Sequence, residues 1–354
     1  MISLGTRRMT ASAAAAHATA PLPPPEVVEL AGDVLGGTSA SLRFVAHERL
    51  KKSVHRLRFD VSAGPSSVVA KRLSLRRARA NQLVMKRWLP AAGLEGGCPD
   101  LRGVLPEPSG SAVWHVYEDI VGRGLDCGLP DPARVRPMVE LIAELHTRFV
   151  GHALLPECRE HGEGHGMGFF TSHVARSVCF LRSLGSEPPA RGHKVLIERL
   201  LGQIERLHAE RHERALLLES CGGPDTLLHG DLWTTNTLIA EQPGGPRPML
   251  IDWDHVGVGP VTYDLSTFLY RFPPECRPWI LVQYRDAAAR RGRQLPNDSV
   301  LNLLFETAEY ARYACRLADA ALAASRGENW AFAQMEEIER WFTALTPVLA
   351  VDGG

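Results

Sequence analysis

Residues 227–239 read LLHGDLWTTNTLI, and residues 249–254 read MLIDWD. Each segment begins as an apolar, strand-like run and is interrupted by acidic or amide side chains where a loop should open. Polar groups at the end of a strand are mounted on a rigid platform and can be aimed at a ligand. Asp231, Asn236 and Asp252 form a set that phosphoryl transfer requires: one carboxylate to orient a hydroxyl, and an amide and a carboxylate to hold magnesium. The pattern therefore indicates metal-dependent phosphotransfer.

Length and composition limit the possible functions. The chain has 354 residues, enough for two domains or one large two-lobed unit. Forty basic residues balance forty acidic ones, so the net charge indicates neither a nucleic-acid nor a membrane partner, and a small molecule is expected. The seven cysteines are scattered without a Cys-x-x-Cys pair, which argues against a disulfide framework and fits a cytoplasmic protein. No apolar run approaches the roughly 20 residues that span a bilayer.

The first third of the chain predicts a small antiparallel sheet. Residues 1–25 are rich in alanine and then in proline, which predicts a disordered tail, with an export signal as the alternative. Alternating or β-branched runs predict strands at residues 41–46, 55–61, 67–73 and 112–117. A basic amphipathic helix is predicted at residues 75–89, ended by Pro90 and Gly93.

From residue 132 onward the sequence predicts mainly helices. Apolar residues recur at spacings of three and four, as at Leu301, Leu304 and Phe305, which predicts a buried face. Helices are predicted at residues 135–150, 173–184, 195–218, 301–322 and 331–345. A sheet with one helix, followed by mainly helical sequence, implies an α+β fold with two lobes.

Several motifs follow one another in the catalytic stretch. Residues 229–236 read HGDLWTTN, followed by IDWD at 251–254, Gly-Pro at 259–260 and YDLS at 263–266. An Asp and an Asn in a loop are by themselves usual turn formers, but here spacing, turn and second strand coincide. The set resembles the aminoglycoside phosphotransferase and choline kinase family, small-molecule kinases that share the protein-kinase-like two-lobed fold. These motifs are specific for the superfamily and not for the substrate.

The resemblance implies domain boundaries and the chemistry of the site. It places an N-terminal nucleotide-binding lobe at residues 26–118 and a C-terminal catalytic and substrate-binding lobe at residues 119–354. Asp231 would be the catalytic aspartate that accepts or orients the proton of the attacking hydroxyl. Asn236 and Asp252 would coordinate Mg²⁺, which bridges phosphate oxygens of ATP, with GTP not excluded. The implied activity is transfer of the γ-phosphate to a hydroxyl group of a small molecule.

Three further polar residues receive supporting roles. His229 is expected to brace the loop through a backbone hydrogen bond. Asp264, at the start of an apparent helix, is expected to be an N-cap and loop anchor. Asp254 is either a support for the site or a surface carboxylate.

Lys71 is the candidate for contact with the nucleotide phosphates. Residues 68–71 read VVAK, which is similar to the third-strand motif of kinases, whereas the alternative is a solvated strand lysine. The chain has only five lysines, which favours a specific role for this one. The helix that should present a glutamate to Lys71 has no acidic residue, and Asn81 or Gln82 occupies the plausible place.

Two segments would complete the nucleotide site. Backbone amides near Ser53, with lysines at 51–52, could cradle phosphate, or the segment is an exposed hairpin tip. The glycine pair at 36–37 precedes the first strand instead. Tyr117 and Glu118 lie where a hinge between the lobes would present backbone groups to adenine, an inference from position alone.

Alternatives stay open. A choline, ethanolamine or homoserine type kinase is the nearest rival, and a cationic acceptor would suit carboxylates and aromatics of the last third of the chain. These candidates are Glu275, Trp279, Tyr284, Asp286, Glu306, Glu309 and Tyr310. A catalytically silent nucleotide-binding regulatory protein is the rival from another class, and a protein kinase is a weaker one. Cys158, His161 and His165 have zinc-like spacing, although such a loop is commonly polar surface.

Overall fold

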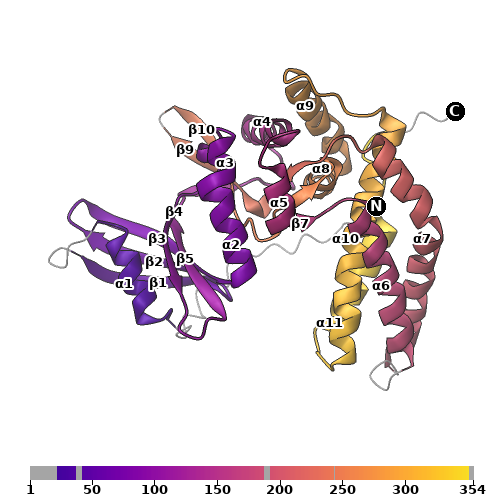
Figure 1. Ribbon diagram of the computed structural model, residues 1–354, viewed down its shortest axis with the longest axis horizontal. Coiled ribbons are helices and arrows are strands. Elements are labelled where there is room, and N and C mark those ends of the chain that lie inside the picture. Colours follow the sequence, from indigo (N-terminus) through magenta and orange to yellow (C-terminus); the bar gives the residue numbers. More distant parts are fainter. Residues whose placement is uncertain (1–21, 37–41, 187–191, 243, 351–354) are drawn as a thin grey trace. The chain divides into compact units, whose positions relative to one another are not determined.

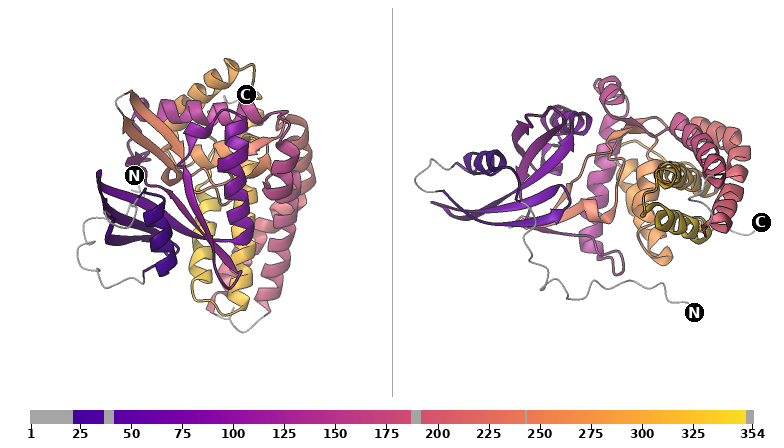
Figure 2. Two further views of the ribbon diagram at one scale, coloured as in Figure 1. Left: turned by 60° about the vertical axis from the view of Figure 1, so that its left-hand side comes forward. Right: turned by 90° about the horizontal axis from the view of Figure 1, so that it is seen from below.

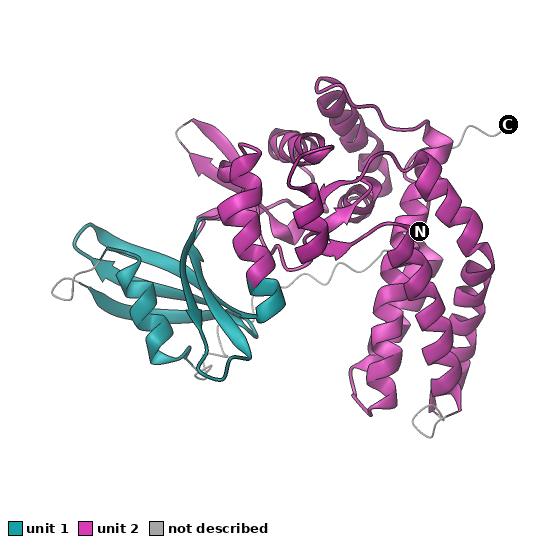
Figure 3. Cartoon of the chain, in the orientation of Figure 1, with its two compact units in different colours: residues 1–78, 100–119 teal, residues 79–99, 120–354 magenta. Residues whose placement is uncertain are grey.

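The computed structural model describes residues 22–36, 42–186, 192–242 and 244–350. The chain packs as two compact units, the first formed by residues up to 78 with 100–119 and the second by residues 79–99 and 120–354 (Figure 3). Residues 79–99, which the sequence analysis counts with the N-terminal lobe, pack with the second unit. Residues 1–21 of the predicted tail, and Gly37 of the glycine pair, lie outside the described residues.

The first unit is built on a five-stranded antiparallel sheet with the strand order β1-β2-β3-β5-β4 (Figure 1). Its strands are β1 Arg43–Lys51, β2 Val54–Val61, β3 Gly64–Ser74, β4 Leu101–Pro106 and β5 Ala112–Glu118. The four predicted strands are therefore present. Strand β4 was not predicted, because this edge strand contains Gly103 and ends in Pro106, two residues that weaken a strand signal.

Helix α1, Pro25–Asp33, supplies part of the apolar core of the first unit. Proline at the first helical position is favourable, because its fixed φ suits the helix and its missing N–H would have no partner there. Val27 and Ala31 of α1 are fully buried in this core. The other buried members come from the sheet: Leu57, Phe59, Val68, Ala70, Trp114 and Val116. The core thus covers the sheet that carries Lys71.

The helix predicted at residues 75–89 is present and runs further than expected. It consists of α2 Leu75–Leu83, a π-helical turn Val84–Trp88 and α3 Leu89–Ala91. The prediction that Pro90 ends the helix is wrong, since Pro90 lies inside α3. The wider π-turn before it relieves the clash that proline otherwise makes with the preceding turn. Gly93, with φ of 64°, follows the end of the helix.

The rest of the second unit is mainly helical, with two small sheets. Its helices are α4 Pro132–Phe149, α5 Leu155–His161, α6 Met167–Gly185, α7 Lys194–Cys221, α8 Thr262–Leu269, α9 Arg277–Ala289, α10 Asp298–Ser325 and α11 Ala331–Ala344. The sheets have the orders β10-β9-β6 and β7-β11-β8. Their strands are β6 Gly122–Gly124, β7 Glu163–Gly164, β8 Thr226–Leu228, β9 Thr237–Gln242, β10 Gly245–Leu250 and β11 Gly257–Gly259. Every helix predicted after residue 132 is found, with shifted ends.

Helices α6, α7, α10 and α11 lie side by side and enclose an apolar cluster (Figures 1 and 2). The face of α10 predicted from its spacing is buried, since Leu301, Leu304 and Phe305 are inaccessible to solvent. No helix in the described parts of the chain is long and apolar enough to cross a membrane.

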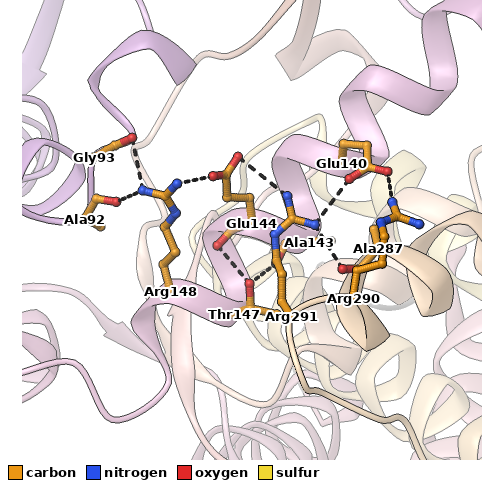
Figure 4. A network of polar contacts seen from close by, with 10 residues as sticks. All are labelled: Ala92, Gly93, Glu140, Ala143, Glu144, Thr147, Arg148, Ala287, Arg290 and Arg291. Atoms are coloured by element: carbon orange, nitrogen blue, oxygen red, sulfur yellow. Dashed lines mark hydrogen bonds and ion pairs between the residues drawn. The ribbon is translucent and has the colours of Figure 1, made fainter.

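A polar network on α4 joins it to α9 and to the loop after α3, all within the second unit (Figure 4). Arg148 of α4 donates to the carbonyl oxygens of Ala92 and Gly93. Glu140 lies earlier in α4 than Arg148. It pairs with Arg290 and with Arg291, the latter at 3.3 Å. These contacts fix the position of α4 within the second unit. Helix α4 carries His146, which contacts Asp264.

Candidate active site

The loop that carries Asp231 begins where the buried strand β8 ends, and Asp264 anchors it. The carboxylate of Asp264 accepts hydrogen bonds from the backbone N–H groups of His229, at 2.7 Å, and Gly230, at 2.9 Å. The predicted role as loop anchor is therefore confirmed. The predicted N-cap role is wrong, because Val261 is the N-cap of α8 and Asp264 lies in its first turn. Its side chain points to the loop instead of to the helix end.

Asp264 is fully buried and stays ionised because donors surround it. His146 donates from Nε2 to its Oδ2 at 3.3 Å and accepts at Nδ1 from the hydroxyl of Tyr284 at 2.9 Å. Burial raises the pKa of Asp264, but the His146 hydrogen bond and the backbone amide of Gly230 outweigh it, so the pKa is lowered. The sequence analysis missed His146, which lies about eighty residues before the motif on a helix face that reads as core.

His229 joins the two halves of the catalytic stretch. Its Nε2 donates to the carbonyl oxygen of Ile251 at 2.9 Å, and its Nδ1 faces the backbone N–H of Asp231 at 3.4 Å. The ring is buried and lies 4.7 Å from the Trp253 ring. The predicted backbone hydrogen bond of His229 is confirmed, and it fixes the segment before Asp252 against the loop that carries Asp231.

Gly230 is required by the backbone path of the loop. Its φ is 80°, and a Cβ at this position would lie 1.8 Å from the carbonyl oxygen of His255 and 2.8 Å from Nε2 of His165. His165 in turn donates to the His255 carbonyl at 2.9 Å and stacks on Tyr263. No other residue fits between these groups without displacing them.

Asp231 and Asn236 face each other across a short 3-10 turn. The amide nitrogen of Asn236 donates to the backbone oxygen of Asp231 at 2.8 Å and to its carboxylate at 3.2 Å. The backbone N–H of Asn236 bonds to Trp233, whose own N–H bonds to the Asp231 carbonyl at 2.8 Å. Because both side-chain contacts of Asn236 use nitrogen, its oxygen Oδ1 is the atom left to bind a cation.

Asp252 adopts a left-handed backbone conformation that few residues other than glycine take. Its φ is 67°, and it is the sole non-glycine residue with positive φ in the described parts of the chain. Aspartate tolerates this conformation better than most residues, and residues held in it cluster at functional sites. The neighbouring backbone N–H of Ile251 donates to the Asn236 carbonyl at 3.0 Å, which brings the two segments together. Sequence gave no sign of this conformation.

The oxygen donors of this site fit a magnesium ion. Mg²⁺ prefers one or two carboxylates, and it takes its remaining ligands from phosphates and water. Asp252 and Asn236 supply one carboxylate and one amide oxygen on neighbouring segments. Within the described ranges no group of three or more His, Cys, Asp or Glu side chains is arranged to hold a metal, the zinc-like Cys158, His161 and His165 included. A metal at this site would therefore need ligands from the substrate.

Asp254 contacts the end of α2. The amide nitrogen of Asn81 donates to its Oδ1 at 3.4 Å. Asn81 is buried and Asp254 is half-buried, so the carboxylate is a support within the second unit and not a freely exposed surface group. The suggested pairing of Asn81 or Gln82 with Lys71 stays a prediction.

Lys71 lies in the first unit and is not a solvated strand lysine. It is 9% exposed and pairs in register with Val54 of β2 and His115 of β5. Burial, followed by the charge of Lys71, lowers the pKa of His115 to about 4, so His115 is neutral at pH 7. A neutral imidazole beside a lysine avoids a second buried positive charge. The sequence analysis missed His115.

The other residues proposed for the nucleotide also lie in the first unit. Ser53 is in a two-residue turn that is shorter than expected, and its carbonyl accepts from Arg72 at 2.9 Å. The Tyr117 hydroxyl bonds to Nδ1 of His115 at 2.8 Å. The backbone N–H of Glu118 donates to the Asp100 carbonyl at 2.9 Å. Asp231, Asn236 and Asp252 are brought together in the second unit.

Several acidic and aromatic residues expected to favour a cationic acceptor have other partners. Tyr284 is buried against His146. Glu309 is buried and hydrogen-bonded to Arg312. Glu306 accepts from Arg214 at 2.8 Å. Glu306 and Glu309 are therefore neutralised by arginines, whereas Glu275 and Asp286 are exposed.

Residues 48–295 match the profile of the phosphotransferase enzyme family, the family of the aminoglycoside phosphotransferases. The chain belongs to this family. The resemblance to aminoglycoside phosphotransferases and choline kinases is thereby confirmed, and with it a phosphotransferase assignment. A comparison with curated proteins by sequence found no match.

Solved structures share the kinase-like fold. A spectinomycin phosphotransferase, in complex with ADP and spectinomycin, is 14% identical with a TM-score of 0.62, covering 93% of this chain and 96% of that one. An ethanolamine kinase from Plasmodium vivax is 10% identical with a TM-score of 0.56, covering 86% and 82%. A choline kinase from Cryptosporidium parvum is 11% identical with a TM-score of 0.55, covering 90% and 94%. The predicted two-lobed α+β fold is confirmed.

Proposed function

We propose that this protein is an ATP-dependent kinase that transfers the γ-phosphate to a hydroxyl group of a small molecule. The arrangement of Asp231 carries the proposal. Its carboxylate is oriented by Asn236 at 3.2 Å, on a loop held by Asp264 and His229. A carboxylate fixed in this way is placed to orient the hydroxyl of the acceptor and take its proton as the phosphoryl group is transferred.

Asn236 and Asp252 would hold Mg²⁺, and Lys71 would contact the phosphates of the nucleotide. When bound, the metal and nucleotide supply the phosphoryl group and offset the charge that develops on it. The positive φ of Asp252 supports its role, because residues held in this conformation cluster at functional sites. The buried position of Lys71 supports its role, because strand lysines without a specific role are usually solvated.

Two other functions have some support. A kinase of the choline, ethanolamine or homoserine type is favoured by the shared fold of the ethanolamine and choline kinases. A nucleotide-binding regulatory protein without transfer activity is suggested by the lack of an acidic residue on α2. The presence of Asp231 with an oriented carboxylate favours an enzyme, since a protein that only binds nucleotide needs no base.

Measurement of ATP turnover with Mg²⁺ across hydroxylated antibiotics, aminoglycosides, choline, homoserine and sugars tests the proposal. Asp231→Asn should abolish acceptor-dependent turnover while nucleotide binding persists. Asp225→Asn, at a surface residue paired with Arg159, is the matched control and should retain full turnover. Equal turnover in Asp231→Asn and the wild type would exclude the mechanism. A thermal shift with ATP and Mg²⁺, without transfer to any acceptor, would favour the regulatory function.

A further inference from the structure

Arginines gather beside the loop that carries Asp231 in the second unit. The guanidinium carbon of Arg271, which follows α8, lies 4.1 Å from the ring centroid of Trp233. That of Arg316, on α10, lies 5.9 Å from the rings of both Trp233 and Trp341. Trp233 is two residues from Asp231, and the backbone N–H of Trp233 donates to the Asp231 carbonyl. This cluster therefore lies next to the proposed base.

The cluster carries more positive than negative charge. Glu309 is its buried carboxylate, bonded to Arg312 and 3.9 Å from Arg271. Arg312 is buried, donates also to the Tyr263 carbonyl at 3.0 Å, and feels the charge of Asp231. Among the described residues Arg316 has neither a hydrogen bond nor an ion pair, only its two aromatic contacts. Glu309 is therefore shared by Arg312 and Arg271, and Arg316 adds a third positive charge beside Trp233.

Two donors of the cluster have no acceptor. The indole Nε1 of Trp233 and the Nε of Arg271 are shielded from solvent and lack a hydrogen-bond partner among the described residues. The Glu309 oxygen Oε2 is a shielded acceptor that also lacks one, and it lies 3.9 Å from Nη2 of Arg271. Shielded donors without acceptors are unfavourable, and native proteins rarely keep them unless a ligand or water completes the site. The side chain of Arg271 is 22% exposed, so it is not fully closed off from solvent.

We propose that Arg271 and Arg316, flanking Trp233, bind an anionic group of the acceptor, a carboxylate or a phosphate, and so select an anionic alcohol as substrate. The inference rests on the proposed function of the same site. Guanidinium groups bind carboxylate and phosphate through paired hydrogen bonds, and a surplus of positive charge disfavours an amine at this place. The Arg312–Glu309 pair holds Arg271 and keeps the charge surplus close to Asp231.

Matched alcohols that differ in charge test this inference. Glucuronate, glucose and glucosamine have the same sugar ring and carry a carboxylate, no charge and an amine. Glycerol 3-phosphate and glycerol make the same comparison for a phosphate group. Calorimetric titration of the protein with Mg²⁺ and a non-hydrolysable ATP analogue measures the affinity for each. We expect one of the two anions to bind at least tenfold more tightly than its neutral counterpart, and the better anion identifies the group. Equal or tighter binding of glucose, glycerol or glucosamine, or no binding of either anion, would overturn the proposal.

Variants locate the effect. Arg271→Gln and Arg316→Gln should each lower the anion-to-neutral affinity ratio about tenfold, which corresponds to about 1.4 kcal/mol. Arg316→Glu should shift the preference toward glucosamine. Arg182→Gln, an exposed arginine of α6 paired with Glu205, is the matched control and should keep the wild-type ratio. An unchanged ratio in both Gln variants would contradict the assignment.

Failure of this inference is distinguishable from failure of the proposed function. If Asp231→Asn loses transfer to a neutral or cationic acceptor while the arginine variants behave as wild type, the kinase function stands and the anionic acceptor is wrong. If the anion affinity depends on the arginines but transfer does not depend on Asp231, the proposed mechanism is wrong and the anion site stands.

Discussion

Asn236 donates a hydrogen bond to the carboxylate of Asp231 at 3.2 Å and a second one to its backbone carbonyl at 2.8 Å. One amide group therefore orients the proposed base while its oxygen stays available to a metal. Asn236→Ala should reduce the transfer rate about a hundredfold, as expected for loss of a group that positions reacting atoms, and raise the Mg²⁺ concentration needed for half-maximal rate. Steady-state rates over a Mg²⁺ series check this. Thr235→Ala, an exposed neighbour, should leave both values unchanged.

Lys71 offers a test of the nucleotide site in the first unit. Lys71→Met keeps the length of the side chain and removes its charge, so it should weaken ATP use about tenfold or more, seen as a higher KM for ATP. Lys86→Met, at an exposed lysine, is the control and should leave the KM for ATP unchanged. Normal binding and turnover of ATP in Lys71→Met would show that the lysine assignment is wrong.

The buried carboxylate of Asp264 should contribute strongly to stability. Asp264→Asn should lower the free energy of unfolding at pH 7 by about 3 kcal/mol, because it breaks a buried charged network. The folded-state pKa of Asp264 is lowered, so its contribution is present at pH values above its unfolded pKa and is lost as the pH falls through the folded one. Urea unfolding at pH 7 and near pH 3 checks both points. An equal difference between variant and wild type at the two pH values would contradict them.

Gly230 and Gly292 separate steric overlap from backbone strain. Both have positive φ, 80° and 74°, but a Cβ at Gly292 meets nothing within 4 Å. Gly292→Ala should lower the free energy of unfolding by about 1 kcal/mol, the strain of a left-handed alanine. Gly230→Ala should lower it by about 3 kcal/mol or more and abolish transfer, since the His255 carbonyl must move. Thermal and urea unfolding of the two variants measure the difference, and similar losses in both would contradict the steric argument.

His115 should make stability depend on pH in the weakly acid range. Its pKa falls from 6.5 to about 4 on folding, so the unfolded chain binds more protons between these values. The free energy of unfolding should therefore fall as the pH decreases from about 6.5 to about 4, by at most about 3 kcal/mol from this group. His115→Gln should show a shallower decrease over this window and no change of slope above pH 7. Parallel curves for wild type and variant would show that His115 does not titrate in this way.

The residues proposed for catalysis have a local signal in the sequence. Asp231, Asn236 and Asp252 lie within one stretch of sequence at fixed spacing, and the loop-anchoring role of Asp264 follows from the same motif. The positive φ of Asp252 could not be predicted, because aspartate is common in turns and its presence does not indicate which φ the residue adopts. The burial of Lys71 likewise depends on how the sheet is covered.

Features that depend on distant partners were missed or misjudged. The carboxylate of Glu306 suggested a site for a cationic acceptor, yet Arg214, which pairs with it, lies 92 residues earlier in the chain. His146 could not be assigned, since its link to Asp264 joins residues 118 positions apart. Pro90 was a misleading helix stop, because the π-turn that accommodates it has no clear sequence signal.

The hydrogen bonds from His229 and Gly230 to Asp264 also close a ring in the chain, since His229 and Asp264 are 35 residues apart. This closed loop of chain contains Asp231, Asn236 and Asp252, which lie nearer in sequence to its two joined ends. The β9–β10 hairpin lies in the middle of the loop. The entropy of closing such a ring rises only slowly with its length. The hairpin is therefore a place where a spectroscopic tag or a longer segment can be inserted without loosening the residues near the joined ends.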